Sequence, residues 1–386
     1  MNKSKVLRRR FLQTVATTAM ASSASAQEEP LRFGMIGVGK RGNAHLRRFV
    51  KRSDVAVKAV CDIDPSARDA AQSKARADNP RSYSDYRELL GQSGIDAVLI
   101  STPCYLHAEM SAAALEAGKH VFCEKPLAIS VDQVKLVLNA ARKSKAVFQI
   151  GQQSRNAPHM QEVVAQIHQA GLIGKPLVIK AQRHSTPSKP GTRRAGGGGQ
   201  RRRFPGWYND VKLSGDLIVE NAVHNLDVCN WLAGSRPESS YGHGKRYLPE
   251  PMPAGKVMMD GFSVEYIYQN DMHLDYSQLY LHPRKLEKLP NGIWFVVYGE
   301  KGAIELNYGS WTFYDMHGDA EPVEHAAEDI DLTEAAHNDF LRAIREGRKP
   351  VADIETAAVA ALTGIMGRES IYQRRMVTWD ELGVSI

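Results

Sequence analysis

Three glycines near the start of the chain have the spacing of a phosphate-binding turn. Gly37, Gly39 and Gly42 follow a short apolar run and precede a stretch with helical periodicity. In such a turn the first glycine permits a tight bend, the second lets the backbone approach a diphosphate, and the third lets helix and strand pack closely. Lys40 and Arg41 stand between the last two glycines. The pattern predicts a dinucleotide-binding turn, with a glycine-rich turn of another α/β protein as the alternative.

The nature of the nucleotide depends on Asp62. This residue lies 25 positions after Gly37, at the end of the second predicted strand. A carboxylate there accepts hydrogen bonds from a ribose diol and repels a 2′-phosphate, which favours NAD over NADP. The charges of Lys40 and Arg41 leave NADP open, and the alternative role for Asp62 is to cap a helix.

A second candidate is Glu124-Lys125-Pro126, directly after the predicted strand 120–123. Ligands of doubly wound sheets bind at this carboxyl edge. We expect a trans proline to fix the bend and to hold Lys125 rigidly. An ammonium beside a cationic nicotinamide ring releases its proton more readily, which suits Lys125 to relay a proton to or from a substrate hydroxyl. A solvated surface lysine is the alternative.

Glu220, His224 and Asp227 are spaced at i, i+4 and i+7 of a predicted helix in 215–227. This spacing places them on one stripe, either in a binding site or as a solvated face with one ion pair. A Glu/His metal site would lack a convincing fourth ligand, so no metal is expected.

The elements that position these residues fall into two patterns. Up to residue 150, short apolar strands alternate with amphipathic helices, which predicts an α/β domain with a doubly wound parallel sheet. Ser130 and Gln133 form a predicted capping box for the helix 131–144. The expected strands are 31–36, 55–61, 97–101, 120–123 and 147–150, and the other expected helices are 43–52, 66–77, 84–91 and 105–117.

After Gly151 the pattern changes to helices near 157–170 and 221–233, alternating strands between 261 and 313, and closing helices near 333–346 and 355–373. Strict alternation predicts an antiparallel sheet in an α+β domain. We therefore expect a nucleotide-binding domain at 27–150 and a second domain at 151–386.

The first 26 residues have the features of an export signal. Arg8-Arg9 with Phe11-Leu12 resembles a twin-arginine signal, followed by a small-residue cleavage site at 24–26. The alternative is an amphipathic or disordered basic tail. No later apolar run approaches the length of a membrane span. We expect a periplasmic or otherwise exported protein that leaves the cytoplasm already folded.

Charge and cysteine content exclude other classes. The 386 residues carry a net charge of +7, but without the five basic residues of the signal the chain has 45 basic and 43 acidic residues, or +2. This excludes a global nucleic-acid footprint. Eight basic residues lie in 180–203, either in a solvated disordered loop or in an anion-binding lid. Cys61, Cys104, Cys123 and Cys229 lack metal spacing and are expected to be buried, with no disulfide assigned.

Together the motifs resemble the Gfo/Idh/MocA family (glucose-fructose oxidoreductase, inositol dehydrogenase and MocA) along the whole mature chain. The resemblance is carried by 37–42, 83–90, Ser101-Thr102-Pro103 with His107, Glu124-Lys125-Pro126, the helix bearing His224, 298–302 and 379–381.

This resemblance implies a Rossmann domain, a C-terminal domain with an open antiparallel sheet, and a substrate site between them. It implies Lys125 as the catalytic lysine and His224 as the partner of the reacting oxygen. The family usually has Asp four residues before this His, where this chain has Glu220. Thr102, Pro103, His107 and Glu124 are implied cofactor contacts, Asp227 joins the substrate site, and the C-terminal sheet is expected to form a homo-oligomer.

Three functions follow as hypotheses. The first is an NAD(P)-dependent oxidoreductase that acts on a sugar or cyclitol hydroxyl. Because soluble nicotinamide cofactors are not supplied outside the cytoplasm, its cofactor would be tightly bound and recycled internally. The second is an NAD-dependent, redox-neutral glycoside hydrolase or lyase. The third is a noncatalytic NAD-binding protein, against which the joint presence of Lys125 and His224 argues.

Overall fold

The computed structural model describes residues 29–186, 207–248, 258–286, 292–319 and 321–386. The residues from Leu31 to Ile386 form one compact unit. The predicted export signal and most of the basic loop lie outside the described residues. In the part that is described, no helix combines the length and apolar character that a membrane span requires.

The first sheet confirms the predicted doubly wound architecture. Its six strands run in the order β3-β2-β1-β4-β5-β6, and every neighbouring pair is parallel. Ligands of such a sheet bind where the strand order reverses, between β1 and β4. The strands are β1 (Leu31–Ile36), β2 (Val55–Cys61), β3 (Arg81–Tyr83), β4 (Ala97–Ile100), β5 (His120–Cys123) and β6 (Phe148–Ile150).

Both faces of this sheet are covered, which is why its strands are apolar throughout. Phe33 and Met35 pack on one face with Leu46 and Phe49, whereas Ile36 and Val98 pack on the other. The crossover helices are α1 (Lys40–Phe49), α2 (Pro65–Lys74), α3 (Tyr86–Leu90), α4 (His107–Glu116) and α5 (Val131–Lys143).

Only half of the predicted capping box at α5 forms. The Ser130 side chain accepts the Gln133 N–H at 3.4 Å, as expected. The Gln133 side chain reaches one residue further back, to the Ile129 N–H, because its amide nitrogen is engaged by the Tyr105 carbonyl.

The second sheet has nine strands in the order β14-β13-β12-β11-β7-β10-β9-β8-β15. It is mostly antiparallel, as predicted, but β7 and β10 pair in parallel. Its strands are β7 (Pro176–His184), β8 (Pro237–Lys245), β9 (Gly261–Tyr268), β10 (His273–Leu279), β11 (Gly292–Gly299), β12 (Gly302–Leu306), β13 (Ser310–Asp315), β14 (Val323–Ala326) and β15 (Val377–Thr378).

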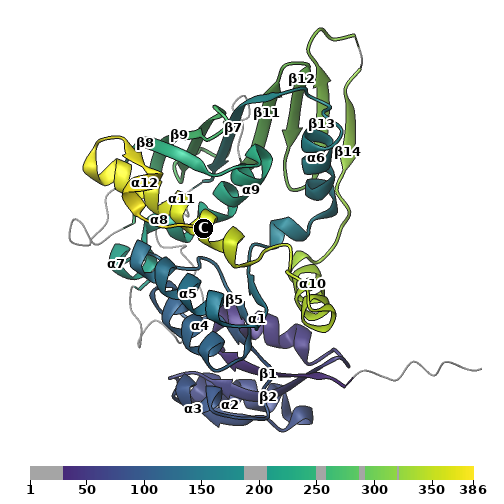
Figure 1. Ribbon diagram of the computed structural model, residues 1–386, viewed down its shortest axis with the longest axis vertical. Coiled ribbons are helices and arrows are strands. Elements are labelled where there is room, and N and C mark those ends of the chain that lie inside the picture. The colour runs from purple at the N-terminus through teal and green to yellow at the C-terminus, as the bar shows by residue number, and fades with distance from the viewer. Residues whose placement is uncertain (1–28, 187–206, 249–257, 287–291, 320) are drawn as a thin grey trace, which may run out of the picture. The chain divides into compact units, whose positions relative to one another are not determined.

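Helices cover one face of this sheet, with α9 and α11 lying under its strands (Figure 1). The alternation along β9 reflects this, because Val264, Tyr266 and Tyr268 are buried and the residues between them are exposed. The remaining helices are α6 (Pro158–His168), α7 (Val211–Ser214), α8 (Asp216–Glu220), α9 (Val223–Ala233), α10 (Leu332–Glu346), α11 (Ile354–Gln373) and α12 (Trp379–Leu382).

Helix α10 follows the second sheet in the chain but packs on the first. Ala336, Phe340 and Leu341 join the apolar cluster of β1 and α1. The Gln149 amide of β6 donates to the Ala336 carbonyl at 2.8 Å. The face of the first sheet that carries α1 is therefore completed by a helix from the C-terminal part of the chain.

Candidate active site

One cavity of ≈ 1650 Å³ contains nearly all of the predicted site residues. It lies at the carboxyl end of the first sheet and extends to β7 and β11 of the second. The predicted residues that line it are Gly37, Gly39, Lys40, Arg41, Asp62, Thr102, Pro103, His107, Glu124, Lys125, Glu220 and His224. Gly42 packs behind the turn, and Asp227 lies outside the lining.

The glycine turn has the close packing that its sequence predicts. Gly37 has φ +81°, a conformation that side chains rarely adopt. A Cβ at Gly42 would lie 2.0 Å from the Gly37 carbonyl oxygen, so α1 can approach β1 only with glycine there. Gly39 begins α1 with no side-chain cap, and no acidic residue stands in the first turn. Its free N–H groups and positive dipole end suit a diphosphate.

Asp62 lies at the rim of the same turn. Its carboxylate accepts the Val38 N–H and the Asp64 N–H, each at 3.0 Å. These bonds orient the carboxylate at the end of β2, and no side-chain cation is hydrogen-bonded to it among the described residues. An oriented carboxylate in this position fits a ribose diol and disfavours a 2′-phosphate. The residues present therefore fit NAD.

His107 connects the two loops that flank the nicotinamide end of the predicted site. One ring nitrogen lies 2.8 Å from the Pro126 carbonyl and the other 2.8 Å from the Thr102 carbonyl. Burial lowers the pKa of His107, while the two carbonyl oxygens act in the opposite direction because the ring can donate to both of them only when it is protonated. His107 thus positions the turn at Lys125 against Thr102 rather than pointing a free nitrogen into the cavity.

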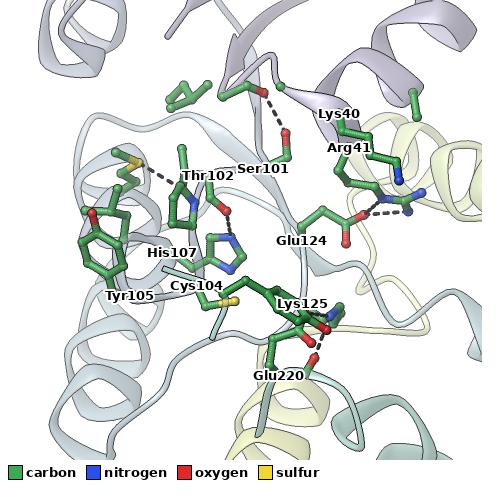
Figure 2. A pocket seen from close by; sticks show the side chains of 18 of the residues that line it. Lys40, Arg41, Ser101, Thr102, Cys104, Tyr105, His107, Glu124, Lys125 and Glu220 are labelled. Carbon is green, nitrogen blue, oxygen red and sulfur yellow. Dashed lines mark hydrogen bonds and ion pairs between the residues drawn. The ribbon is translucent and has the colours of Figure 1, made fainter. Parts of the chain in front are cut away.

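Glu124 is the centre of a buried network. It accepts hydrogen bonds from Arg41 at 2.7 Å and from His45 at 2.8 Å (Figure 2 shows Arg41 pointing toward it). Burial alone would favour the neutral acid, but the His45 hydrogen bond and the Arg41 charge outweigh it and lower the pKa of Glu124. Glu124 is therefore an anion that positions Arg41.

The network continues into the C-terminal part of the chain. Nδ1 of His45 lies 2.7 Å from Nε2 of His337 on α10. Burial lowers the pKa of both histidines. Since His45 must donate to the Glu124 carboxylate through Nε2, its Nδ1 accepts from His337. Nδ1 of His337 is buried with no hydrogen-bond partner among the described residues.

Lys125 is held by a single residue of the second domain. Its Nζ donates to the carbonyl oxygen and to Oε1 of Glu220, both at 2.6 Å (Figure 2). Our expectation of a trans bond before Pro126 is wrong, because the Lys125–Pro126 bond is cis. The tertiary amide before proline favours trans by only about 0.5–1 kcal/mol, so the sequence did not determine the isomer.

The stripe of Glu220, His224 and Asp227 does not lie on one helix as predicted, although the helix expected near 221–233 is confirmed as α9. Helix α8 ends at Glu220 and α9 begins at Val223, with Asn221 and Ala222 between them. Glu220 and His224 nevertheless both line the cavity. The interruption leaves the Glu220 carbonyl available to accept a hydrogen bond from Lys125.

Glu220 and His224 both keep polar atoms without a hydrogen-bond partner among the described residues. Oε2 of Glu220 is buried with no donor in bonding geometry among the described residues, although burial and then the Glu220 charge raise the pKa of the nearby Tyr208 hydroxyl. The His224 ring makes no hydrogen bond to any residue in the described ranges. Burial, and then the positive charge of Lys125, lowers the pKa of His224 to about 3. Its imidazole is neutral at physiological pH.

Asp227 has a different role from its two predicted companions. It is 1% exposed and accepts Nε of Arg155 with both oxygens at 3.0 Å. Arg155 also lies over the ring of Trp231, 5.0 Å from its centroid. The contacts of Asp227 therefore join α9 to the segment before α6, outside the cavity.

Several cavity residues were not predicted. They are Arg183 on β7, Ile293 on β11, and Ser154, Trp207, Tyr208 and Tyr308, which lie between strands. No local motif marks them, and Arg183 and Ile293 come together only through the pairing of β7 with β11. The four cysteines are buried, as expected, and the structure has all four free.

Comparisons with known proteins agree with this architecture. Residues 31–152 match the model of an oxidoreductase family with an NAD-binding Rossmann fold, and residues 165–379 match the C-terminal alpha/beta domain of the same family. The second match alone covers more than half of the chain.

Individual relatives have low sequence identity with this chain. The uncharacterized oxidoreductase YrbE of Bacillus subtilis is 32% identical over 214 residues, which cover 55% of this chain and 56% of that protein. The chain thus spans little more than half the length of that relative. The scyllo-inositol 2-dehydrogenase (NAD(+)) of Bacillus subtilis is 25% identical over 92% of this chain and 97% of that protein.

Among solved structures, levoglucosan dehydrogenase in complex with NADH and levoglucosan has a TM-score of 0.74 at 21% identity, covering 90% of this chain and 99% of that one. This likeness shows the fold. With both family models matched in order and the glycine turn, Asp62 and Lys125 in place, the chain belongs to the Gfo/Idh/MocA oxidoreductase family.

Proposed function

We propose that this protein is an NAD-dependent oxidoreductase that acts on a hydroxyl group of a sugar or cyclitol. The observation that carries the proposal is the meeting of Lys125, Glu220 and His224 at the end of a cavity whose other end has the glycine turn and Asp62. Relatives named as inositol dehydrogenases support a polyhydroxylated substrate.

The proton chemistry follows from the contacts. Bound NAD would supply the hydride acceptor. Lys125 Nζ lies 2.6 Å from Glu220 Oε1, so Lys125 can pass a proton to this carboxylate and take the proton of the substrate hydroxyl. The neutral His224 ring has a donor and an acceptor nitrogen available to hold the reacting oxygen. In the reverse direction the same groups return the proton.

The test combines nucleotide identification with product analysis. Purified protein is denatured and its nucleotide identified, and native protein is then incubated with myo-inositol, D-glucose and levoglucosan. We expect NAD or NADH, reduction of bound NAD by one of these polyols, and a keto product seen by NMR. A protein that binds NAD but reduces it with no polyol would contradict the proposed activity and favour a binding role.

The proposal includes export and internal recycling of the cofactor. The twin-arginine pattern of the first residues supports delivery of a folded protein to the periplasm. A nucleotide bound before export would have to be reoxidised within the site. Lys125 and Glu220 suit this cycle because their proton transfer is reversible.

We also propose that the C-terminal sheet joins two copies of the chain. Its face opposite the helices exposes Tyr241, Ile267 and Tyr298, which are 52%, 39% and 43% accessible. Apolar groups gathered on one sheet face are typical of interfaces. Sedimentation should show an oligomer that Ile267→Glu dissociates and that Leu136→Glu, an exposed position on α5, leaves intact. A monomeric wild-type protein would overturn this proposal.

A further inference from the structure

Arg183 occupies an unusual place in the second sheet. Ile179, Ala181 and Arg183 point toward the same face of β7, and the first two are 0% and 3% exposed in the apolar core. The row ends at Arg183, which is partly buried and lines the cavity. A charged side chain therefore stands where an apolar face meets the site.

The strands on either side provide no partner for this charge. Arg183 is in register with Gln278 of β10 and with Ile293 of β11. Gln278 accepts the Tyr276 hydroxyl at 3.0 Å and donates to Asn221 at 2.9 Å. Ile293 is apolar. Among the described residues, the Arg183 guanidinium makes no hydrogen bond and no ion pair.

The other cations of the cavity differ from Arg183. Arg41 pairs with Glu124, Lys125 with Glu220, and Arg87 with Asp85 and Glu109. Lys40 and Arg47 are exposed to solvent. Within the described part of the cavity, Arg183 is thus the partly buried cation that no carboxylate neutralises.

The tyrosines around Arg183 do not supply a negative charge. Burial raises the pKa of Tyr276 well above its ordinary value and raises that of Tyr280, although the Arg183 charge acts in the opposite direction. The Arg183 charge also contributes to the lowered pKa of His224, after burial and Lys125. The electrostatic field of Arg183 therefore reaches His224, which lines the same cavity.

We infer that the substrate is an anionic ring, a sugar that carries a carboxylate, and that Arg183 binds this carboxylate. An arginine at the edge of a low-dielectric site is stabilised by a planar anion that accepts two parallel hydrogen bonds. One uncompensated positive charge matches one carboxylate. The inference rests on the proposed function only in taking the ligand to be a hydroxylated ring.

The test measures binding and hydride transfer separately in the full-length NAD-loaded protein. Calorimetry compares D-glucuronate with D-glucose and D-galacturonate with D-galactose, and includes glucuronamide as a neutral isostere and glucose 6-sulfate as a second anion. The variants are Arg183→Gln and Arg183→Lys. Lys180→Gln is the matched control, because Lys180 lies on the opposite face of β7 and pairs with Asp275.

We expect at least one uronate to bind roughly 10- to 100-fold more tightly than its neutral partner, the range of one charge-assisted hydrogen-bonded pair. Arg183→Gln should bring this ratio close to one, Arg183→Lys should retain part of it, and Lys180→Gln should leave it unchanged. Equal binding of each uronate and its neutral partner, or an unchanged ratio in Arg183→Gln, would overturn the inference. Stronger binding of the sulfate than of both uronates would overturn the assignment to a carboxylate.

The two proposals fail in different ways. If the uronates bind selectively through Arg183 but no sugar reduces bound NAD, the proposed oxidoreduction is wrong and the anion site stands. If a neutral sugar reduces bound NAD and carboxylates bring no advantage, the proposed function stands and the anion site is wrong.

Discussion

Lys125 is held by two oxygen atoms of one residue, and this contact determines what its substitution should do. Methionine keeps most of the stem volume but has no proton to relay. We expect Lys125→Met to retain nucleotide while turnover falls by about 10²-fold or more, the usual scale for loss of a general acid or base. Single-turnover reduction of bound NAD measures the effect.

The matched control is Lys143→Met, at an exposed position on α5. It should behave as wild type. If Lys125→Met turns over at the control rate, Lys125 takes no part in proton transfer. If it loses nucleotide, the loss of turnover reports binding and not chemistry.

The next prediction concerns the protonation state of His224. With a pKa near 3, His224 is neutral above that pH, so lowering the pH from 8 to 5 should not protonate it. NMR of protein with labelled histidine, assigned with His224→Gln, should show no titration of this ring in that interval. A midpoint between pH 5 and 7 would contradict the buried neutral imidazole.

The kinetic counterpart follows from the same contacts. His224→Ala removes the group facing the reacting oxygen and should nearly abolish turnover. Glu220→Gln keeps an oxygen for Lys125 but removes the charge that receives its proton, so it should lower turnover by less than His224→Ala does and leave it measurable. Small and equal effects of both changes would place this pair outside the chemistry.

A site residue could be predicted from the sequence where a local motif marks it. The glycine turn and Asp62 were predictable because a strand end and a tight turn carry their own signature. The cis bond before Pro126 was not, since proline permits both isomers. Arg183 was missed because only the pairing of β7 with β10 and β11 brings it to the cavity, and Tyr308 because no motif marks the turn between β12 and β13.

At the scale of elements, α10 is joined to the first sheet through one chain of hydrogen bonds. His337 contacts His45, which contacts Glu124, and the chain ends in an aromatic cluster with Phe49 and Phe122. His337→Leu should leave Nδ1 of His45 buried without a donor. We expect a loss of about 1–3 kcal/mol in the free energy of unfolding, measured by chemical denaturation.

Two further variants separate this effect from general loss of a histidine. His337→Gln provides an amide donor at a similar reach and should recover part of the stability. His317→Leu, at an exposed position, should change it little. If His337→Leu and His317→Leu have equal stability, the network contributes nothing measurable.

The interruption between α8 and α9 shows where periodicity misleads. The apolar spacing through 215–227 continues across the break, so the sequence placed Glu220 and His224 on one helix. Gly215 has φ +84° and Asp216 φ +71°, and the Asp216 carboxylate accepts the Leu217 N–H at 2.6 Å. These local contacts start the short helix α8. It ends at Glu220, whose carbonyl oxygen accepts a hydrogen bond from Lys125.

At the scale of the whole molecule, the sequence predicted two sheets but not which helices cover them. Crossover helices between parallel strands follow from chain direction, because the connections must return on the sheet faces. The packing of α10 on the first sheet has no such rule, since 332–346 is separated from β1 by almost the entire chain. Its contacts depend on the apolar side chains of the first sheet that α1 leaves uncovered.

The last prediction concerns the protein as an exported, self-contained catalyst. If the chain leaves the cytoplasm folded, spent NADH cannot be exchanged for NAD at its destination, so each turnover must return the hydride. Lys125, Glu220 and His224 can move protons in either direction, which such a cycle requires. We expect the purified protein to keep its nucleotide through gel filtration and to convert substrate without added NAD. The net reaction would then be transhydrogenation between two sugars, or hydrolysis or elimination within one glycoside. Product stoichiometry decides: one NADH released per product, with a strict need for fresh NAD, would exclude the closed cycle and establish an ordinary dehydrogenase.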